Sequence, residues 1–353
     1  MPFSLSVALR ELHQRRGSDL HLKADATATV RVLGDLVPID NVPVTENELT
    51  AIFESIANEK LVKDFREKGE VDFRYSIPNL CHYRVNFYKT FNGTAAAFRE
   101  IPASIPSLEE LGVNPDLKKL SMLDSGLVLV TGPTGSGKST VTAALIDYAN
   151  QRRKDHILTI EDPIEFIYQD KSCFVSQREV GTHSQSFADA LRVALREDPD
   201  IIVVGEMRDY ETVSLAIEAA ETGHLVFATL HTRSAAQTVD RIIDIFPSDD
   251  KAQIRASLAD SLQAVMSVAL MKAADGTHRV QAMEILMANP AIRNLIREGK
   301  THQIPNVLQT GKAQGMCTMD DALEDLLREG EITRETALKY ARNPDKFKSS
   351  PIY

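Results

Sequence analysis

Residues 132–140 restrict the possible folds of this chain most strongly, because they form the glycine-rich loop GPTGSGKST. The short apolar run Gly126–Val130 precedes the loop, and a stretch with helical residue types follows it from Val141. A strand, a glycine loop and a helix in this order direct backbone amides and the positive helix end at one point. The matching flanks therefore favour the phosphate-binding pattern G-x-x-x-x-G-K-[ST] over a glycine turn without a ligand.

Every residue of the loop is a candidate nucleotide contact: Gly132, Pro133, Thr134, Gly135, Ser136, Gly137, Lys138, Ser139 and Thr140. We expect Lys138 to reach the β- and γ-phosphates and the Ser139 hydroxyl to bind Mg²⁺. The sequence lacks an Asn-Lys-x-Asp segment of the kind that recognises guanine, which makes a GTPase unlikely. ATP and Mg²⁺ are the predicted ligands.

Composition limits the class of protein further. A length of 353 residues with a 43% hydrophobic share is enough for about two domains with real cores. The net charge of −10 argues against a broad nucleic-acid surface, so no nucleic-acid partner is expected. Three separated cysteines, Cys81, Cys173 and Cys317, indicate a reducing cytoplasm. No run approaches the about 18 apolar residues of a membrane span, so we expect membrane association only through a partner.

The pattern of elements predicts two domains and a linker. Residues 1–100 have the mixed periodicity of a small α+β domain, and the proline-marked segment 101–120 is the expected linker. Residues 121–353 alternate strand-like and helix-like segments up to about residue 230, which predicts an α/β fold with a mainly parallel sheet. After about residue 250 we expect only helices, apart from a possible strand at 279–286.

The segment 82–101 predicts a hairpin around the two-residue turn Asn92-Gly93. In that register Asn86 faces Arg99. Strand alternation places Arg84, Asn86 and Arg99 on one face and apolar side chains on the other. Spacing alone favours a solvated polar face for the two arginines over a ligand site.

Acidic residues follow two of the apolar strands. Glu161, Asp162 and Glu165 come directly after the run 157–160, and Glu206 follows the run 201–205. Acids at strand ends beside a phosphate loop are suited to ordering Mg²⁺ and activating water. We expect Glu206 to hold the Mg²⁺ shell through water. The alternatives are a solvated turn for the first group and a helix cap for Glu206.

Two histidines and two arginines are further candidates. His231 ends the strand-like run 225–230 and is placed to sense the γ-phosphate, whereas His224 lies at the opposite end of that run. Whether His224 is functional or structural stays open. Arg293 and Arg297 share one face of the predicted helix 291–298, and solvation is the default interpretation of such a face.

Five motifs occur in order: GPTGSGKST, TIEDPIEF, REDPDIIVVGEMRD, ETGHLVFATLHT and AIRNLIRE. On these motifs the chain resembles the secretion ATPase superfamily of type II secretion and type IV pili. AIRNLIRE is similar to a signature of its pilus retraction motors. The resemblance covers nearly the whole chain. It departs at Lys23–Thr29, where the family usually has a proline-containing segment, so only the surface of the N-terminal domain is affected.

The resemblance implies a homohexamer whose subunits have a PAS-like N-terminal domain and a RecA-like ATPase domain. It implies that Arg84 and Arg99 reach the phosphates, in contrast to the solvated face favoured by spacing. The acidic box, which is the segment TIEDPIEF at residues 159–166, would supply the catalytic glutamate, with Glu161 slightly preferred to Glu165. Arg293 and Arg297 would serve retraction rather than hydrolysis.

The expected activity is ATP hydrolysis that powers pilus retraction and twitching motility. The implied partner is an inner-membrane pilus platform protein, and a second retraction ATPase is a further possible partner. The expected location is the cytoplasm, peripheral to the inner membrane. Three alternatives stay open: an accessory retraction motor, an extension or type II secretion ATPase, and a nucleic-acid translocase. A non-catalytic nucleotide-binding scaffold would bind ATP without releasing phosphate. Extension motors usually carry a four-cysteine zinc site and a longer N-terminal region, which this sequence does not show.

Overall fold

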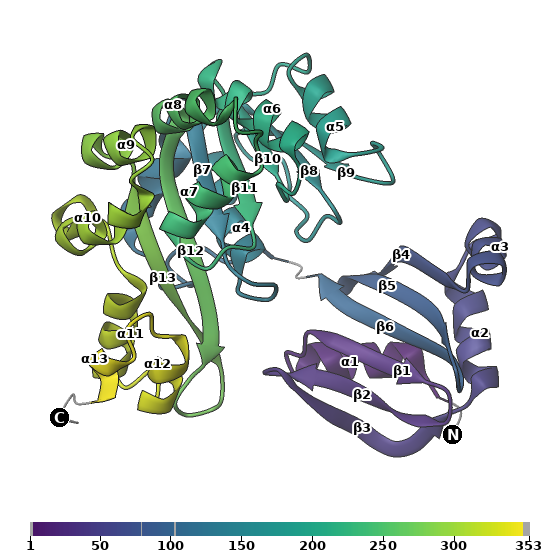
Figure 1. Cartoon of the computed structure of the whole chain (residues 1–353). Coiled ribbons are helices and arrows are strands. Elements are labelled where there is room, and N and C mark those ends of the chain that lie inside the picture. The colour runs from purple at the N-terminus through teal and green to yellow at the C-terminus, as the bar shows by residue number, and fades with distance from the viewer. Residues whose placement is uncertain (1–2, 79, 102–103, 349–353) are drawn as a thin grey trace. The chain divides into compact units, whose positions relative to one another are not determined.

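The computed structural model describes residues 3–78, 80–101 and 104–348, and the chain divides into two compact units, Met1–Ser104 and Ile105–Tyr353 (Figure 1). The division lies within the segment 101–120 that the sequence assigns to a linker. From residue 108 onward this segment packs on the second unit, where Leu108, Leu117 and Leu120 are buried in its core. Most of the expected linker is therefore part of the second unit.

The first unit is an antiparallel sheet in the order β3-β2-β1-β6-β5-β4, with helices packed on one face (Figure 1). Its elements are α1 (Leu5–Gln14), β1 (Asp19–Lys23), β2 (Ala26–Val32), β3 (Asp35–Val44), α2 (Glu46–Ile56), α3 (Glu59–Lys68), β4 (Glu70–Ile77), β5 (Cys81–Thr90) and β6 (Gly93–Ile101). Leu9 of α1 and Phe53 of α2 join Phe87 and Phe98 of the sheet in one buried cluster. The small α+β domain expected from the sequence is confirmed.

The β5–β6 hairpin forms with a register two residues away from the predicted one. Thr90 pairs with Gly93, and Arg84, not Asn86, lies opposite Arg99. The turn therefore centres on Phe91-Asn92. The predicted type of turn needs positive φ at both central residues, but only Gly93 has it here, at 116°. A shift by two preserves strand alternation, so the prediction of the two faces is confirmed.

The second unit is an α/β domain around a seven-stranded sheet in the order β13-β12-β7-β11-β10-β8-β9. Neighbouring strands are parallel except for the antiparallel pair β12–β13. The strands are β7 (Gly126–Thr131), β8 (His156–Glu161), β9 (Phe174–Glu179), β10 (Ile201–Val204), β11 (Leu225–Leu230), β12 (Leu262–Lys272) and β13 (Arg279–Met287). This arrangement confirms the predicted α/β class with a RecA-like parallel sheet.

Helices cover both faces of this sheet and pack beside the outer part of its long β12–β13 hairpin. The helices are α4 (Lys138–Asn150), α5 (Phe187–Ala194), α6 (Tyr210–Glu221), α7 (Ala235–Asp244), α8 (Lys251–Ser261), α9 (Pro290–Arg297), α10 (Ile304–Thr310), α11 (Met319–Arg328), α12 (Arg334–Tyr340) and α13 (Asp345–Lys348). The core on one face includes α4, and the core on the other includes α5 to α10. Figure 1 shows α11, α12 and α13 gathered beside the β12–β13 hairpin. No helix of the described residues is long and apolar enough to cross a bilayer.

The expectation of an almost entirely helical region after residue 250 is wrong at β12. Its sequence LQAVMSVALMK is rich in leucine, alanine and methionine, which are good helix formers. Pairing with β7 on one side and β13 on the other overrides that preference, and most of the strand is buried. Strand β9 was also not expected, because its sequence FVSQRE is short and polar and lies at the sheet edge.

Parallel register brings the predicted chemical groups to one edge of the sheet. Val204, the last residue of β10, pairs with Ile160 of β8 and Ala228 of β11, and Leu230 pairs with Thr131 of β7. The segments that follow these strands therefore leave the sheet at the same edge. In parallel α/β sheets, ligands bind beyond the carboxyl ends of the strands.

Candidate nucleotide-binding and hydrolysis site

The glycine loop turns sharply between β7 and α4. Gly132 has φ 146°, and a Cβ there would lie 2.4 Å from the carbonyl oxygen of Val268 and 2.5 Å from Ser136 Oγ. Only glycine fits that position. Gly137 precedes the first helical residue with φ 93°. Ser136 Oγ is buried and has no hydrogen-bond partner among the described residues. The loop thus offers an unused polar atom and a helix N-terminus, as a phosphate cradle requires.

Lys138 is held inside this loop. Its Nζ donates to the carbonyl oxygens of Gly132, at 2.8 Å, and Pro133, at 3.1 Å. Only 8% of the residue is exposed. Burial lowers the pKa of Lys138, while the nearby carboxylates of Glu165 and Glu206 oppose that shift. A cation with two backbone acceptors and two acidic neighbours can exchange its carbonyl contacts for phosphate oxygens.

Glu161 and Glu165 differ in environment although they lie four residues apart. Glu161 Oε1 accepts hydrogen bonds from Thr159 Oγ1 at 2.6 Å and Gln177 Nε2 at 3.2 Å, and its Oε2 accepts from the Glu165 backbone N–H at 3.3 Å. Burial raises the pKa of Glu161 above its ordinary value. Glu165 and Asp162 are exposed. Glu161 therefore holds the turn together through its hydrogen bonds. Glu165 is exposed to a ligand, and its charge partly offsets the lowering of the Lys138 pKa by burial.

Glu206 lies at the centre of a charged cluster beyond β10. Its carboxylate accepts hydrogen bonds from Arg208, with Nη2 2.6 Å from Oε2, and His231 Nε2 lies 2.8 Å from Oε1. Burial raises the pKa of Glu206, but Arg208 and His231 outweigh this effect and hold it below its usual value. Glu206 is therefore ionised at neutral pH. When another charge is placed beside an ionised carboxylate that contacts a histidine, the interaction within that pair changes.

His224 lies at the other end of β11 from His231, as the sequence predicts. Its Nδ1 is 3.0 Å from the carbonyl oxygen of Ala219, at the end of α6. This contact connects helix and strand, so the structure supports the structural interpretation of His224.

Arg293 and Arg297 fasten α9 to the end of α8. Arg293 donates to the backbone carbonyl of Asp260 at 2.7 Å and to Gln263 Oε1 at 3.2 Å, and Arg297 pairs with the Asp260 carboxylate. Burial lowers the pKa of Arg293, which the Asp260 charge partly offsets. An acidic partner thus compensates the like charges of α9, and neither arginine is simply a solvated cation.

Arg84 and Arg99 lie directly opposite each other on the first unit. Their side chains are 44% and 62% exposed. Arg99 Nε donates to Asp19 Oδ1 at 2.7 Å, and Arg84 Nε is 3.7 Å from Asp72 Oδ1. Like charges directly opposite each other across strands are destabilising. The two aspartates reduce that cost, so the hairpin presents two exposed arginines that each have an acidic partner.

A family model described as "Type II/IV secretion system protein" matches residues 5–342. The chain belongs to this family. The match confirms the resemblance found from the five motifs, and it includes both units.

Individual members of the type II/IV secretion system protein family support a narrower comparison. The chain is 51% identical over 330 residues to "Type IV pilus retractation ATPase PilT" of Pseudomonas aeruginosa, with 94% of this chain and 96% of that protein covered. It is 52% identical to "Twitching motility protein" of Neisseria gonorrhoeae, covering 92% and 87%. The crystal structure of the pilus retraction motor PilT with bound ADP matches with a TM-score of 0.88 and 43% identity over 98% of each chain.

Two site residues, Arg208 and Gln177, were not singled out from the sequence. Arg208 lies within the motif REDPDIIVVGEMRD, two residues after Glu206, and that spacing could have indicated the ion pair. Gln177 lies on β9, a strand that was not expected, and its amide also donates to the Phe166 carbonyl oxygen at 2.8 Å. Nothing in the local sequence connects it to the acidic box.

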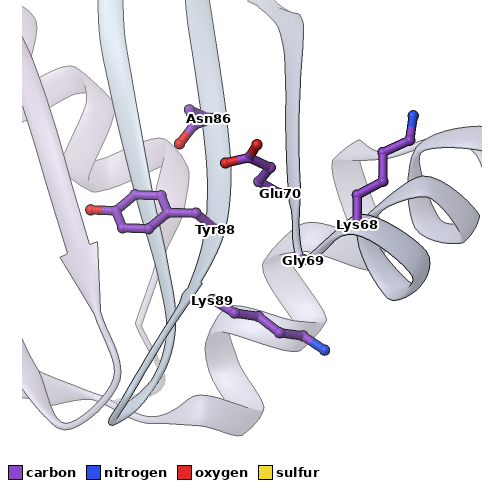
Figure 2. Close-up of a pocket in the computed structure, with 6 residues that line it drawn as sticks. All are labelled: Lys68, Gly69, Glu70, Asn86, Tyr88 and Lys89. Carbon is purple, nitrogen blue, oxygen red and sulfur yellow. The ribbon is translucent and has the colours of Figure 1, made fainter.

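Figure 2 shows a pocket on the first unit that contains no predicted site residue. It has a volume of about 450 Å³ and lies where α3 meets β4 and β5. Its lining is Lys68, Gly69, Glu70, Asn86, Tyr88 and Lys89. All of the lining residues belong to the first unit, and most of them are polar.

Proposed function

We propose that the chain is a Mg²⁺-dependent ATPase motor that powers type IV pilus retraction. Support for ATP hydrolysis comes from Lys138, Glu165 and Glu206, which lie at the carboxyl edge of the parallel sheet beside the glycine loop. The biological role rests on one observation, the 51% identity to a pilus retraction ATPase over nearly the full length of both chains.

The loop 132–140 would bind the phosphates of ATP. Lys138 would give up its two carbonyl contacts for the β- and γ-phosphates, and the amides at the start of α4 would donate to phosphate oxygens. Mg²⁺, held by the Ser139 hydroxyl and through water by Glu206, would offset negative charge on the phosphates. The buried, unpaired Ser136 Oγ supports this fit because it offers one more donor inside the cradle.

Glu165 is our candidate for orienting and deprotonating the attacking water. Both oxygens of Glu161 already accept hydrogen bonds within the protein, whereas the Glu165 side chain is exposed and close enough to affect Lys138. A general base must reach the proton that it removes. These contacts favour Glu165, although the sequence slightly favoured Glu161.

Arg84 and Arg99 are proposed to stabilise charge on the γ-phosphate. Two exposed guanidinium groups opposite each other can exchange their contacts with Asp72 and Asp19 for charge-assisted bonds to one phosphate. ATP would then attract the hairpin more strongly than ADP does, and phosphate release would end that attraction. A ligand drives a conformational change only through such a difference in affinity.

The motor is proposed to be a homohexamer acting on an inner-membrane pilus platform protein from the cytoplasmic side. Helix α9, fixed to α8 by Arg293 and Arg297, would transmit movement and take no part in hydrolysis. His231 would sense the γ-phosphate through its contact with Glu206. No nucleic-acid partner is proposed.

An accessory retraction motor is the second candidate. The chain is 39% identical to "Type IV pilus ATPase PilU" of Pseudomonas aeruginosa over 94% of its length, which is lower than its identity to the retraction ATPase of that organism. This difference favours the main motor. The two motors of one cell could act together, so a second retraction ATPase is a proposed partner.

Deletion of the gene from a piliated host tests the direction of movement. Loss of a retraction motor predicts abundant surface pili without twitching, and restoration by the wild-type chain but not by Lys138→Ala. Bald cells would instead indicate an extension motor. Normal twitching in the deletion strain would instead indicate an accessory retraction motor.

A further inference from the structure

His13, Cys81 and Glu100 meet on the first unit, and none of the three is assigned to the ATPase reaction. His13 comes from the last turn of α1, Cys81 begins β5, and Glu100 lies near the end of β6. His13 Nδ1 is 2.8 Å from Glu100 Oε1, and Cys81 Sγ is 3.3 Å from the same oxygen and 3.4 Å from His13 Nδ1. Three segments far apart in the sequence thus bring nitrogen, sulfur and oxygen donors to one point.

The spacing of these atoms is close to that of a tetrahedral metal site. Zinc lies about 2.3 Å from a thiolate sulfur, about 2.0 Å from an imidazole nitrogen and about 2.1 Å from a carboxylate oxygen. Two such ligands at the tetrahedral angle are about 3.3–3.6 Å apart. The Cys81–His13 distance already fits, whereas the Cys81–Glu100 distance must widen by about 0.3 Å and the His13–Glu100 contact by about 0.5 Å. The backbone does not have to move far to admit an ion.

The surroundings of Glu100 give an independent reason for a cation. Glu100 lies opposite Tyr83, on the face of the hairpin that packs against the core, and its side chain is only 15% exposed. Both neighbours contact Oε1, while Oε2 is buried and has no hydrogen-bond partner among the described residues. An unpaired buried carboxylate oxygen is costly, and a metal ion bound by both oxygens of Glu100 would satisfy it. The 46% exposure of His13 provides a path from solvent.

We propose that His13, Cys81 and Glu100 bind a zinc ion. His13 would coordinate through Nδ1, Cys81 through its sulfur and Glu100 through its carboxylate, and water would complete the tetrahedron on the exposed side of His13. On binding, the thiol proton leaves to solvent and the sulfur becomes a thiolate ligand. The ion would join the end of α1 to the hairpin that carries Arg84 and Arg99. It is a structural site, distinct from Mg²⁺ at the glycine loop.

Cobalt titration of the full-length, chelator-treated protein without nucleotide tests this assignment. Co²⁺ replaces zinc in tetrahedral sites, and a thiolate ligand produces a near-ultraviolet charge-transfer band that an oxygen-only site does not give. We expect one equivalent per chain with this band and with intense visible bands, and competition by Zn²⁺. Zinc should also raise the unfolding temperature, because it binds only the folded state.

Two variants and two matched controls locate the site. Cys81→Ser should abolish the charge-transfer band, and His13→Ala should weaken cobalt binding at least about 100-fold, the upper end of the loss caused by removing outer-shell partners. His13→Ala leaves the core intact because the side chain is half exposed. His82→Ala, next to Cys81 but on the other face of β5, and Cys317→Ser should bind like the wild type.

Three results would overturn the proposal. One is the absence of a charge-transfer band in wild-type protein at saturating Co²⁺. Another is a band that persists unchanged in folded His13→Ala protein. The third is an unfolding temperature that zinc raises equally in the wild type and in His13→Ala. Each would show that the three side chains form a hydrogen-bonded cluster without a metal.

Discussion

Replacing each box glutamate by glutamine separates the general base from the group that shapes the turn. For Glu165→Gln we expect a fall in kcat of about 10²–10⁴-fold, the usual contribution of a general base. At 1.36 kcal/mol for each factor of ten, this corresponds to about 2.7–5.4 kcal/mol of lost transition-state stabilisation. Nucleotide affinity should change little, because the base acts on water and not on the phosphates.

Glu161→Gln should behave differently because of its contacts. The glutamine oxygen can keep the bonds from Thr159 and Gln177, and only the 3.3 Å bond from the Glu165 backbone N–H is lost. One such bond contributes about 1 kcal/mol to stability. Burial raises the pKa of Glu161 and so favours its neutral form more than in an exposed glutamate, and the neutral form is the one that an amide resembles. We expect kcat to fall by less than about tenfold.

Single-turnover phosphate release at saturating ATP measures both variants, with binding of a fluorescent nucleotide and urea unfolding as controls. The assignment requires the loss at Glu165 to exceed the loss at Glu161 by a factor of ten or more. If folded, nucleotide-binding Glu161→Gln were as inactive as Glu165→Gln, or if Glu165→Gln kept turnover within about threefold of wild type, the reasoning from hydrogen-bond occupancy would be refuted.

Three further predictions concern other parts of the chain. Arg84→Ala and Arg99→Ala should each lower ATP turnover by at least tenfold while the control Arg66→Ala on α3 does not; unchanged turnover in both would remove the arginines from the reaction. Arg297→Ala should abolish twitching but keep ATPase activity within about threefold, since it removes only a contact between α9 and α8; loss of hydrolysis as complete as in Lys138→Ala would contradict the division of labour. Burial raises the pKa of Glu284, so its contribution to folding is most favourable below the ordinary value of 4.5 and decreases as pH rises through the folded-state pKa. Urea unfolding at several pH values should show this decline in wild type and a flatter profile in Glu284→Gln; a difference between the two that does not change with pH would refute it.

The parallel sheet and the placement of the chemical groups were predictable from the sequence. Uninterrupted apolar runs such as 201–204 predict buried parallel strands, and the first acid after such a run must lie at the carboxyl edge of the sheet. The sequence alone was therefore enough to assign the glycine loop, Glu161 and Glu206 to one edge of the sheet. The position of each acid followed from chain order and needed no tertiary information.

Features that depend on pairing between distant segments could not be predicted in the same way. The hairpin register shifted by two residues, since strand alternation is the same for every even shift and does not specify the pairing partner of Arg99. Strand β12 has the residue composition of a helix, and it is a strand because it pairs with β7 on one side and β13 on the other. The cluster of His13, Cys81 and Glu100 joins segments up to 87 residues apart, so no local pattern marks it.

The central claim is that the glycine loop and the acids of the adjacent strand ends act on one triphosphate. A crystal structure of the chain with Mg²⁺ and a non-hydrolysable ATP analogue tests it most directly. We predict that Lys138 Nζ leaves the carbonyls of Gly132 and Pro133 to contact the β- and γ-phosphates, with Glu206 in the metal shell. A terminal phosphate distant from both Lys138 and Glu206 would contradict the account.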